Sequence, residues 1–411
     1  MPRSDRFRIA VRRFDAFESA VAEQWQHWEA TARTGLRLEA VAMDLPELED
    51  ALLGQQGLRN GAWDVAFLPT DWIPAVAASD AVVDLAPMLA VDAPEEYPEA
   101  WPESLLRLQR HGKAVLGLPY HDGPECLLYR TDVMKDAALQ QEHAQRYGAP
   151  LRPPQTWDEF HRTARFLHGR RPGMAGAVLA GFPDGHNLVY DFLLHLWTRG
   201  GEIELAPDRL RLQQPAALEA LRYYRALATD VLAVHPQSAA FDSVQAGLAF
   251  AAGEAAMAVN WFGFAALAHT ADHSRARGHV SVAPIPHGEG GTSASLNVYW
   301  ILSLAAGSPH RRLAWSFLRH CASPPMDLLT TQHGGIGCRR ATWQHPEVLR
   351  SLPFCNQLET LHRTAREIPA RQDWPQIAAI LDRMMTATIA TTRPVPTLLA
   401  EAQAALQARP G

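Results

Sequence analysis

The chain has 411 residues, of which 47% are hydrophobic and 20% charged. That is an ordinary composition for a globular protein, and the length suits two hydrophobic cores better than one. The net charge of −6 at pH 7 argues against nucleic acid as a partner, because no basic excess is available to neutralise phosphates. Lys113 and Lys135 are the only lysines, so chemistry that needs an activated lysine is not expected.

The first 120 residues alternate between strand and helix signals. Apolar runs with strand character are separated by stretches in which leucines recur at helical spacing, as at Leu45, Leu48 and Leu52. The expected strands are 8–14, 36–43 and 63–69, and the expected helices are 16–32 and 45–56. This βαβαβ order predicts a mostly parallel sheet, whose ligands bind beyond the carboxyl ends of the strands. The loops that begin at Phe14, Thr70 and Tyr120 are therefore candidates for function.

The segment 124–255 is expected to be mainly helical. Thr156 followed by Glu159 is a typical N-terminal capping pair. A second helix should end at Gly200-Gly201, and a third should start near Pro215. Residues 241–261 are expected to pass from a helix into a strand, 279–286 and 297–304 to form strands, and the chain after Ser308 to be almost entirely helical.

No run of residues is apolar enough to predict a membrane span, and the N-terminus lacks the apolar core of an export signal. The expectation is that such a signal has been removed, with a cytoplasmic protein as the alternative. The cysteines Cys126, Cys321, Cys338 and Cys355 lack metal-ligand spacing and are expected to be buried thiols. A Cys338–Cys355 bridge is the alternative in an oxidising compartment.

Motifs for catalysis are missing from the sequence. There is no HExxH, GxSxG, Walker A or strand-linked GxGxxG pattern, and the glycines of GGIGCRR (334–340) have neither a preceding strand nor a following lysine. Asp71 and Asp122 could form a carboxylate pair of the glycosidase kind, but a sugar-binding site would also contain carboxylates. The expectation is a protein without catalytic residues, bound metal or cofactor.

Two apolar runs each end on an aromatic residue beside hydrogen-bonding groups. AMAV is followed by Asn260-Trp261, and AVLGLP is followed by Tyr120-His121-Asp122. An aromatic face next to amide, carboxylate and imidazole groups suits a ligand with one apolar face and a rim of hydroxyls. Sugars have this character.

These two runs, with further segments in the same order, resemble the extracellular solute-binding proteins of ABC importers (family 1), in the cluster that binds maltose, trehalose, related carbohydrates or glycerol phosphates. The matching segments extend over almost the whole chain. They include DVAFLPTDWIPAVAASDAVVDLAPML, RTDVM, PPQTWDEF, YDFLLHLWTRGGEI, FAAGEAAMAVNWFGFAAL, VAPIPHGEGGTSAS and AWSFLRHCASP.

The resemblance implies a two-lobed α/β fold of the periplasmic-binding-protein type II. The chain would cross between the lobes near 115–120, 257–262 and 308–318, with the ligand in the cleft. One lobe would comprise 1–117 and 261–318, and the other 118–260 and 319–411. A monomer at the periplasm or cell surface, delivering to the transmembrane subunits of an ABC permease, is implied as well.

Site residues follow from the same resemblance. Trp261 matches the aromatic residue that stacks on the ligand in the family, and the alternative is a tryptophan of the core. Asn260 is either a turn residue or a ligand contact. Asp71 is a helix cap or a ligand carboxylate, and Trp72 a cover of the sheet or an aromatic contact. Of Tyr299 and Trp300, which alternate faces, one is expected to reach the ligand. Arg339, or its neighbour Arg340, is the arginine that touches the ligand in relatives or else a surface residue.

The first crossing loop adds Tyr120, His121 and Asp122, and the loop after the first strand adds Phe14. Many relatives have aspartate where this chain has Gly123, so Asp122 is expected to replace it. The predicted function is capture of a small carbohydrate or polyol for an ABC importer. The alternatives are a phosphorylated or sulfonated polyol in the same fold, a glycan-processing enzyme, and a cytoplasmic sugar sensor.

Overall fold

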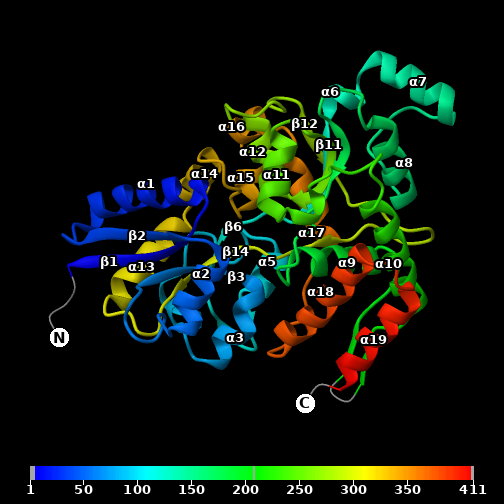
Figure 1. Ribbon diagram of the computed structural model, residues 1–411. Helices are drawn as coiled ribbons and strands as arrows, with labels where there is room; N and C mark the ends of the chain where they lie inside the picture. Colours follow the sequence, from blue (N-terminus) through cyan, green and yellow to red (C-terminus); the bar gives the residue numbers. More distant parts are fainter. Residues whose placement is uncertain (1–4, 207–208, 409–411) are drawn as a thin grey trace. The chain divides into compact units, whose positions relative to one another are not determined.

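The computed structural model describes residues 5–206 and 209–408, which form two compact units (Figure 1). The first unit comprises Met1–Gly123, Asn297–His362 and Glu367–Gln372. The second comprises Pro124–Leu296, Arg363–Arg366 and Asp373–Gly411. Each unit is therefore assembled from segments that are far apart in the sequence.

The first unit is built on a five-stranded sheet in the order β2-β1-β3-β14-β6. The strands β1 (Arg6–Arg12), β2 (Arg37–Met43) and β3 (Val65–Pro69) are parallel to one another, as the alternating pattern predicted. The strand β14 (Trp300–Leu304) lies between β3 and β6 (Leu118–His121) and runs antiparallel to both. The carboxyl ends of β1, β3 and β6 therefore meet at the edge where β14 begins.

Helices cover this sheet and complete its core. The long α1 (Asp15–Ala32) packs with α13 (Arg311–Cys321) and α14 (Pro324–Gln332). Phe7, Trp25, Trp28 and Phe317 form a cluster of buried rings between these elements. The remaining elements are α2 (Leu45–Glu49) with a π-helical turn at Asp50–Gly54, a 3-10 turn at Thr70–Trp72, α3 (Ile73–Ala78), α4 (Ala86–Asp92), α5 (Glu103–Leu108), the hairpin of β4 (Arg110–His111) and β5 (Ala114–Val115), α15 (Arg340–Trp343), α16 (Pro346–Ser351), a 3-10 turn at Cys355–Gln357, and α17 (Leu358–Arg363).

The second unit has a four-stranded sheet in the order β12-β7-β11-β8. Its strands are β12 (Val280–Ala283), β7 (Glu125–Arg130), β11 (Ala255–Trp261) and β8 (Ala175–Val178). The prediction of mainly helix between 124 and 255 missed β7 and β8. Short apolar runs such as CLLY fit a strand and a buried helix equally well, and pairing with β11 and β12 decides for the strand.

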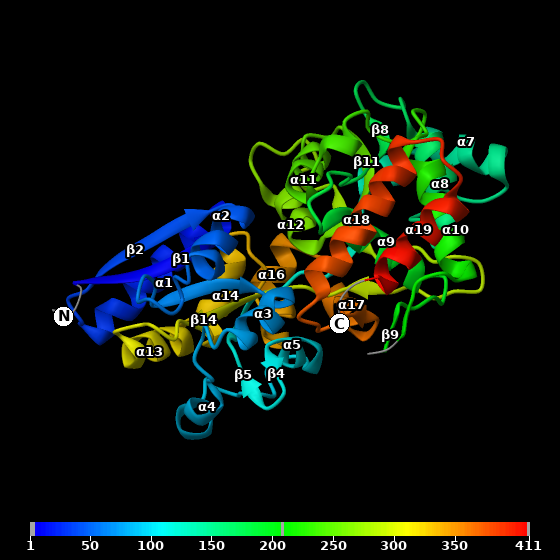
Figure 2. The ribbon, with the colours of Figure 1, turned by 60° about the horizontal axis from the view of Figure 1, so that its bottom comes forward.

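Helices of the second unit follow the predicted caps closely. In α8 (Trp157–Leu167) the Thr156 hydroxyl accepts from the Glu159 N–H at 3.2 Å, and the Glu159 carboxylate accepts from the Thr156 N–H, which confirms the capping pair. α9 (Asn187–Trp197) and α10 (Pro215–Ala228) lie beside the C-terminal α18 (Trp374–Ala390) and α19 (Val395–Gln407), as Figure 2 shows. The remaining elements are α6 (Thr131–Met134), α7 (Ala137–Tyr147), the pair β9 (Glu204–Ala206) and β10 (Arg209–Arg211), a 3-10 turn at Ser238–Ala240, α11 (Ser243–Ala251), α12 (Phe262–Thr270), and the pair β13 (Ser295–Leu296) and β15 (Ala365–Arg366).

The two units differ from the expected lobes in four segments. Residues 118–123 and 367–372 were expected in the second lobe but lie in the first unit. Residues 261–296 were expected in the first lobe but lie in the second unit, because β12 pairs with β7 there. Residues 319–362 were expected in the second lobe but lie in the first unit, because α14 packs against α1. The Gln24 side chain of α1 donates to the Thr330 hydroxyl of α14 at 3.0 Å.

All four cysteines are buried thiols, and Cys338 and Cys355 are not bridged. Over the parts of the chain that the structure describes, no helix combines the length and apolarity needed to cross a membrane.

Candidate functional site

Four half-buried side chains stand at the edge of the first sheet where β1, β3 and β6 end. They are Phe14, Asp71, His121 and Trp300, called here the Trp300 group. Trp300 is paired with Pro69 on one side and with His121 on the other. Asp71 follows Pro69 by two residues, in the turn that leads into α3. The sequence predicted this edge as a ligand site, and the described structure places these four residues there.

The aromatic members of the Trp300 group rest on the buried ring of Phe17. Its centroid lies 4.8 Å from the His121 ring and 5.8 Å from the Trp300 ring, both in edge-to-face geometry. Phe14 packs edge-to-face on Phe17 at 5.1 Å and on His121 at 6.3 Å. A buried aromatic base of this kind holds the outer rings in fixed orientations.

His121 is fixed by a backbone hydrogen bond as well as by ring packing. Its Nδ1 lies 2.9 Å from the N–H of Ile336, so Nδ1 is the acceptor. The neighbouring Asp122 N–H donates to the Ile336 carbonyl at 2.9 Å. Burial lowers the pKa of His121 to about 4, with the charge of Asp122 opposing, so the imidazole is neutral at physiological pH.

Three of the aromatic residues expected at the site belong to the core of the first unit. Tyr120 is 2% exposed and donates its hydroxyl to the Gln24 side chain at 3.0 Å. Tyr299 is 1% exposed and donates to the Leu105 carbonyl at 2.7 Å. Trp72 is buried in the same hydrophobic cluster. Strand alternation explains why Trp300, the neighbour of Tyr299, is the one that reaches the surface.

Asp122 is fully buried within the first unit. One of its carboxylate oxygens lies 2.7 Å from Nε2 of His362, whose Nδ1 lies 3.0 Å from the Ser104 hydroxyl. The indole of Trp343 stacks on the His362 ring at 5.1 Å with an interplanar angle of 6°. This set of contacts gives Asp122 a partner inside the core, where a buried carboxylate requires one.

Arg339 is also a buried residue, with 1% of its surface exposed. Its guanidinium is 2.6 Å from the Glu96 carboxylate, donates to the Glu95 and Ala322 carbonyls, and lies over the Trp101 ring at 4.6 Å. These contacts tie the 95–101 loop to the segment between α14 and α15. Neither the ligand role nor the surface role anticipated for Arg339 describes this environment, whereas the adjacent Arg340 is exposed.

In the second unit, Trp261 ends β11 and is half-buried. Its indole meets the Tyr190 ring of α9 edge-to-face at 5.9 Å. Across the ladder, Trp261 is paired with Glu125, the first residue of β7. Directly opposed residues in a sheet project from the same face, so the Glu125 carboxyl lies beside the indole. Trp261, Tyr190 and Glu125 are called here the Trp261 group.

Glu125 was not among the residues predicted for the site. It is 7% exposed, and its Oε2 is buried without a hydrogen-bond partner among the described residues. Burial, reinforced by the charge of Asp191, raises the pKa of Glu125 well above its ordinary value, which favours the protonated carboxyl. A charged residue opening the apolar run ECLLYR, opposite Trp261 once the strands are paired, was the available signal.

Asn260 has both ends of its amide occupied within the second unit. Its nitrogen donates to the Ser243 carbonyl at 2.9 Å, and its oxygen accepts from the Trp261 N–H at 2.8 Å. With 2% exposure, it links the start of α11 to the end of β11. Asn260 thereby orients the backbone of Trp261, in agreement with the turn-residue alternative.

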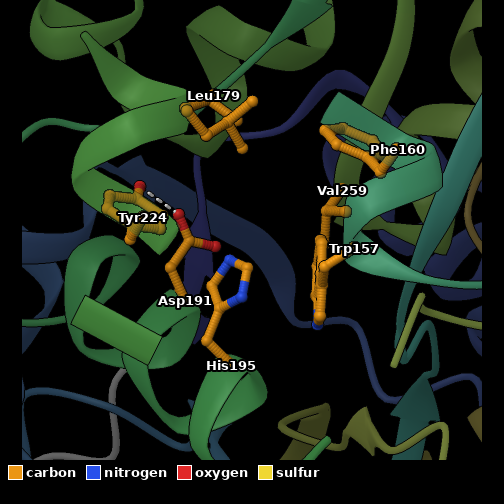
Figure 3. Close-up of a pocket in the computed structure, with 8 residues that line it drawn as sticks. Trp157, Phe160, Leu179, Asp191, His195, Tyr224 and Val259 are labelled. Carbon is orange, nitrogen blue, oxygen red and sulfur yellow. Dashed lines mark hydrogen bonds between the residues drawn. The ribbon is translucent and has the colours of Figure 1, made fainter. Parts of the chain in front are cut away.

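A small cavity lies inside the second unit (Figure 3). Its walls include Trp157, Asp191, His195, Tyr224 and Val259, and its size is on the order of one water molecule. Tyr224 donates to the Asp191 carboxylate, and Arg199 donates to Nδ1 of His195 at 3.1 Å. Burial raises the pKa of Asp191 to about 7, and burial with the charge of Arg199 lowers that of His195 well below its ordinary value. The cavity is too small for a sugar.

No cluster of three or more His, Cys, Asp or Glu side chains suited to a metal ion is found within residues 5–206 and 209–408. The Trp300 group offers aromatic rings, the His121 imidazole and the Asp71 carboxyl. The Trp261 group offers aromatic rings and the Glu125 carboxyl. Each group by itself contains residue types that can stack on a ligand and exchange hydrogen bonds with its hydroxyls.

The fold is shared with solved sugar- and polyol-binding proteins. The maltose-bound MalE3 of T. maritima superposes with a TM-score of 0.85 at 20% identity, covering 98% of this chain and 99% of that one. The ribitol complex of a solute-binding protein from Agrobacterium radiobacter K84 gives a TM-score of 0.84 at 20% identity and covers 99% of both chains. These likenesses confirm the predicted two-lobed α/β fold.

Sequence comparison points the same way. A probable ABC transporter-binding protein of Deinococcus radiodurans is 24% identical over 347 residues, which are 82% of this chain and 77% of that protein. The family model described as bacterial extracellular solute-binding protein matches residues 11–327, which is most of the chain. The chain therefore belongs to the bacterial extracellular solute-binding protein family.

Proposed function

We propose that this protein is the substrate-binding component of an ABC importer, capturing a small uncharged carbohydrate or polyol. The Trp300 group is the candidate ligand contact of the first unit, and the Trp261 group that of the second. The protein would act as a monomer at the periplasm or cell surface, deliver the ligand to the transmembrane subunits of the permease, and leave it chemically unchanged.

The ligands named for structurally similar proteins support this proposal. Besides the maltose and ribitol complexes, similar solute-binding proteins are described with α-D-tagatose, from Thermotoga lettingae, and with D-mannitol, from Agrobacterium vitis. All four ligands are uncharged and rich in hydroxyls. The family membership supports the transport role, and these neighbours support the ligand class.

The single observation that carries the proposal is the pairing of Trp261 with Glu125. The pairing puts a half-buried indole on the same face of the sheet as a carboxyl group whose pKa is raised by burial. Together they would provide stacking for the apolar face of a sugar and a hydrogen bond for a hydroxyl at its rim. His121 and Trp300 offer the same combination on the other unit. Of the residues first predicted, Phe14, Asp71, His121, Trp261 and Trp300 are kept as ligand contacts, and Glu125 is added.

The alternative of a phosphorylated or sulfonated polyol is less well supported. A similar structure, UgpB of Mycobacterium tuberculosis with glycerophosphocholine, has a TM-score of 0.77, so the fold alone does not decide. Arg339, the arginine expected to bind the negative charge of such a ligand, is instead buried against Glu96 and Trp101. The carboxyl of Asp71 in the Trp300 group would further disfavour an anion.

A thermal-shift screen of maltose, ribitol, D-tagatose, D-mannitol and glycerol 3-phosphate tests the proposal. A ligand present at 100 times its Kd should stabilise the folded protein by about 2.7 kcal/mol, which raises the melting temperature measurably. At least one uncharged compound is expected to bind. If glycerol 3-phosphate were the only compound that stabilised the protein, the result would favour the phosphorylated or sulfonated polyol as the ligand.

The glycan-processing alternative is tested by recovering the ligand. After prolonged incubation with a large excess of maltose, chromatography should return maltose only. Accumulation of glucose in proportion to the protein concentration would contradict a role restricted to transport.

A further inference from the structure

The segment Gly334–Ile336 lies against His121 although the two are far apart in the sequence. The Ile336 N–H donates to Nδ1 of His121 at 2.9 Å, while the Ile336 carbonyl accepts from the Asp122 N–H at 2.9 Å. The N–H and the carbonyl of Ile336 thus both form hydrogen bonds at the end of β6, with His121 and Asp122. These two hydrogen bonds fix the position of the His121 imidazole and make its Nδ1 an acceptor.

We infer that the Gly335-Ile336 backbone holds His121 in a single tautomer, with Nδ1 as acceptor and Nε2–H presented as a hydrogen-bond donor to an oxygen of the bound sugar or polyol. The inference rests on the proposed function for the identity of the ligand. The tautomer itself follows from the contacts within the first unit.

Donor and acceptor inventories lead to this assignment. A neutral imidazole has one protonated nitrogen and one acceptor nitrogen, and a main-chain N–H can only donate. Since Nδ1 receives the Ile336 N–H, the ring proton is on Nε2. The lowered pKa of His121 removes the doubly protonated form at neutral pH. Phe14 and Phe17 pack on the ring edge-to-face, so its plane does not turn freely.

Gly335 is what lets the segment approach so closely. A Cβ at this position would lie 2.9 Å from the Thr330 carbonyl oxygen, 2.8 Å from the Thr330 side chain and 3.4 Å from Nδ1 of His121. The backbone of α14 cannot yield as a flexible side chain could, so a methyl group here would push Gly335 and Ile336 away from the imidazole. Gly335 and Ile336 are therefore positioning residues for the His121 donor.

A donor without charge selects among oxygen acceptors. Nε2–H can bind a hydroxyl, ring or glycosidic oxygen, but it brings no positive charge to a phosphate or carboxylate. Trp300, which is paired with His121 in the sheet and rests on the same Phe17 ring, presents its surface next to this donor. The pair would fix one hydroxyl relative to the apolar face of the ligand.

Two substitutions of His121 test the roles of Nδ1 and Nε2 separately. In His121→Asn the amide oxygen takes the place of Nδ1 and keeps the Ile336 contact, but nothing replaces Nε2–H. In His121→Gln an amide N–H reaches the place of Nε2, while the acceptor for Ile336 is lost. We expect His121→Asn to weaken binding about tenfold, with a melting temperature lowered less than in His121→Gln, and His121→Gln to retain most affinity. His27→Asn, at an exposed position of α1, is the matched control and should alter neither.

The measurements are calorimetric titration with whichever of maltose, ribitol, D-tagatose and D-mannitol binds tightest, and two-bond ¹H–¹⁵N spectra of the histidine rings in the free protein at pH 7. The spectra should show His121 with a protonated Nε2 and an unprotonated Nδ1, and Gly335→Ala should give a mixture of the two tautomers together with weaker binding. A protonated Nδ1, or equal affinity of His121→Asn and the parent protein, would overturn the inference. If none of the four compounds binds, the proposed function is contradicted and the ligand contact with it, a result that the spectra of the free protein distinguish from a wrong tautomer.

Discussion

The indole of Trp261 and the phenol ring of Tyr190 meet edge-to-face, with centroids 5.9 Å apart and planes at 89°. Tyr190 is buried, whereas Trp261 is only half-buried. The contact therefore braces the tryptophan from one side without enclosing it. This arrangement is the one we expect if Trp261 contacts a ligand, as proposed, and does not simply fill the core.

Replacing Trp261 by alanine should separate these two roles. Trp261→Ala is expected to weaken ligand binding by about 2–4 kcal/mol, through loss of stacking and of apolar burial. That is a thirtyfold or greater rise in Kd. The free energy of unfolding without ligand should fall by only about 1 kcal/mol, mainly from the lost contact with Tyr190.

Trp157 provides the matched control in the same unit. It is 3% exposed, and its indole N–H donates to the Thr198 hydroxyl at 2.8 Å. Trp157→Ala should destabilise the free protein by about 3–5 kcal/mol and leave the affinity of the folded fraction nearly unchanged. Urea unfolding and calorimetric titration of both variants measure the two quantities. The same pattern in the two variants would mean that Trp261 is a core residue.

Arg339 should matter for stability and not for affinity. Removing it leaves the Glu95 and Ala322 carbonyls without their donor and the Trp101 ring without its cation. Arg339→Ala is expected to lower the free energy of unfolding by about 3 kcal/mol, while the affinity for the identified sugar stays within about twofold. Arg340→Ala, at the exposed neighbouring position, should change neither value. A large loss of affinity in Arg339→Ala at unchanged stability would restore the role that the resemblance assigned to it.

The carboxyl of Glu125 should act in its protonated form. Because its pKa is raised by burial and by Asp191, glutamine is a close substitute for it at neutral pH. Glu125→Gln should keep the affinity within about threefold, whereas Glu125→Ala should lose about tenfold or more. Titrations at pH 7 compare the two variants. Equal losses in both would indicate that the ligand requires a carboxylate.

Asp191 should make the protein less stable as the pH rises. Its pKa is about 7 in the folded protein, and near 4 in an unfolded chain. Between these values the folded state keeps a proton that the unfolded state has released, so the free energy of unfolding falls as the pH increases. Asp191→Asn cannot ionise and still offers an oxygen to Tyr224.

The stability of Asp191→Asn relative to the parent protein should therefore rise by about 1 kcal/mol per pH unit between pH 4 and pH 7. Urea unfolding at pH 5 and pH 7.5 measures this difference. Asp158→Asn, at an exposed position of α8, should follow the parent protein at both values. Parallel pH profiles of Asp191→Asn and the parent protein would contradict the raised pKa.

Local patterns predicted much of the fold. Helical spacing and strand runs identified β1, α1, β2 and β3 to within a few residues, and the cap at Thr156 was found from two residues alone. These features depend on neighbours in the sequence. β7 and β8 were missed because only their partners β11 and β12, more than a hundred residues away for β7, determine that they are strands.

The site residues stay a prediction, and the structure shows only which of them lie at strand ends and which are buried in a core. The strand ends carrying Phe14, His121, Trp261 and Trp300 could be inferred from the order of elements. Which of the candidate residues are buried could not be inferred in this way. Arg339, for example, is enclosed by the 95–101 loop, and no local sequence pattern indicates that contact. Glu125 was overlooked for a related reason, because its significance comes from the residue opposite it on another strand.

The place of β14 in the first sheet has a consequence for biosynthesis. β14 lies between β3 and β6, so that sheet stays divided until Trp300–Leu304 has been made, and α14 must still follow to cover α1. The second unit likewise lacks α18 and α19 until residues 374–407 have been made. Contacts of such long sequence separation form slowly, and neither core can close on a partial chain. The nascent polypeptide thus cannot complete the first sheet before β14 has been made, or the second unit before α19 has followed.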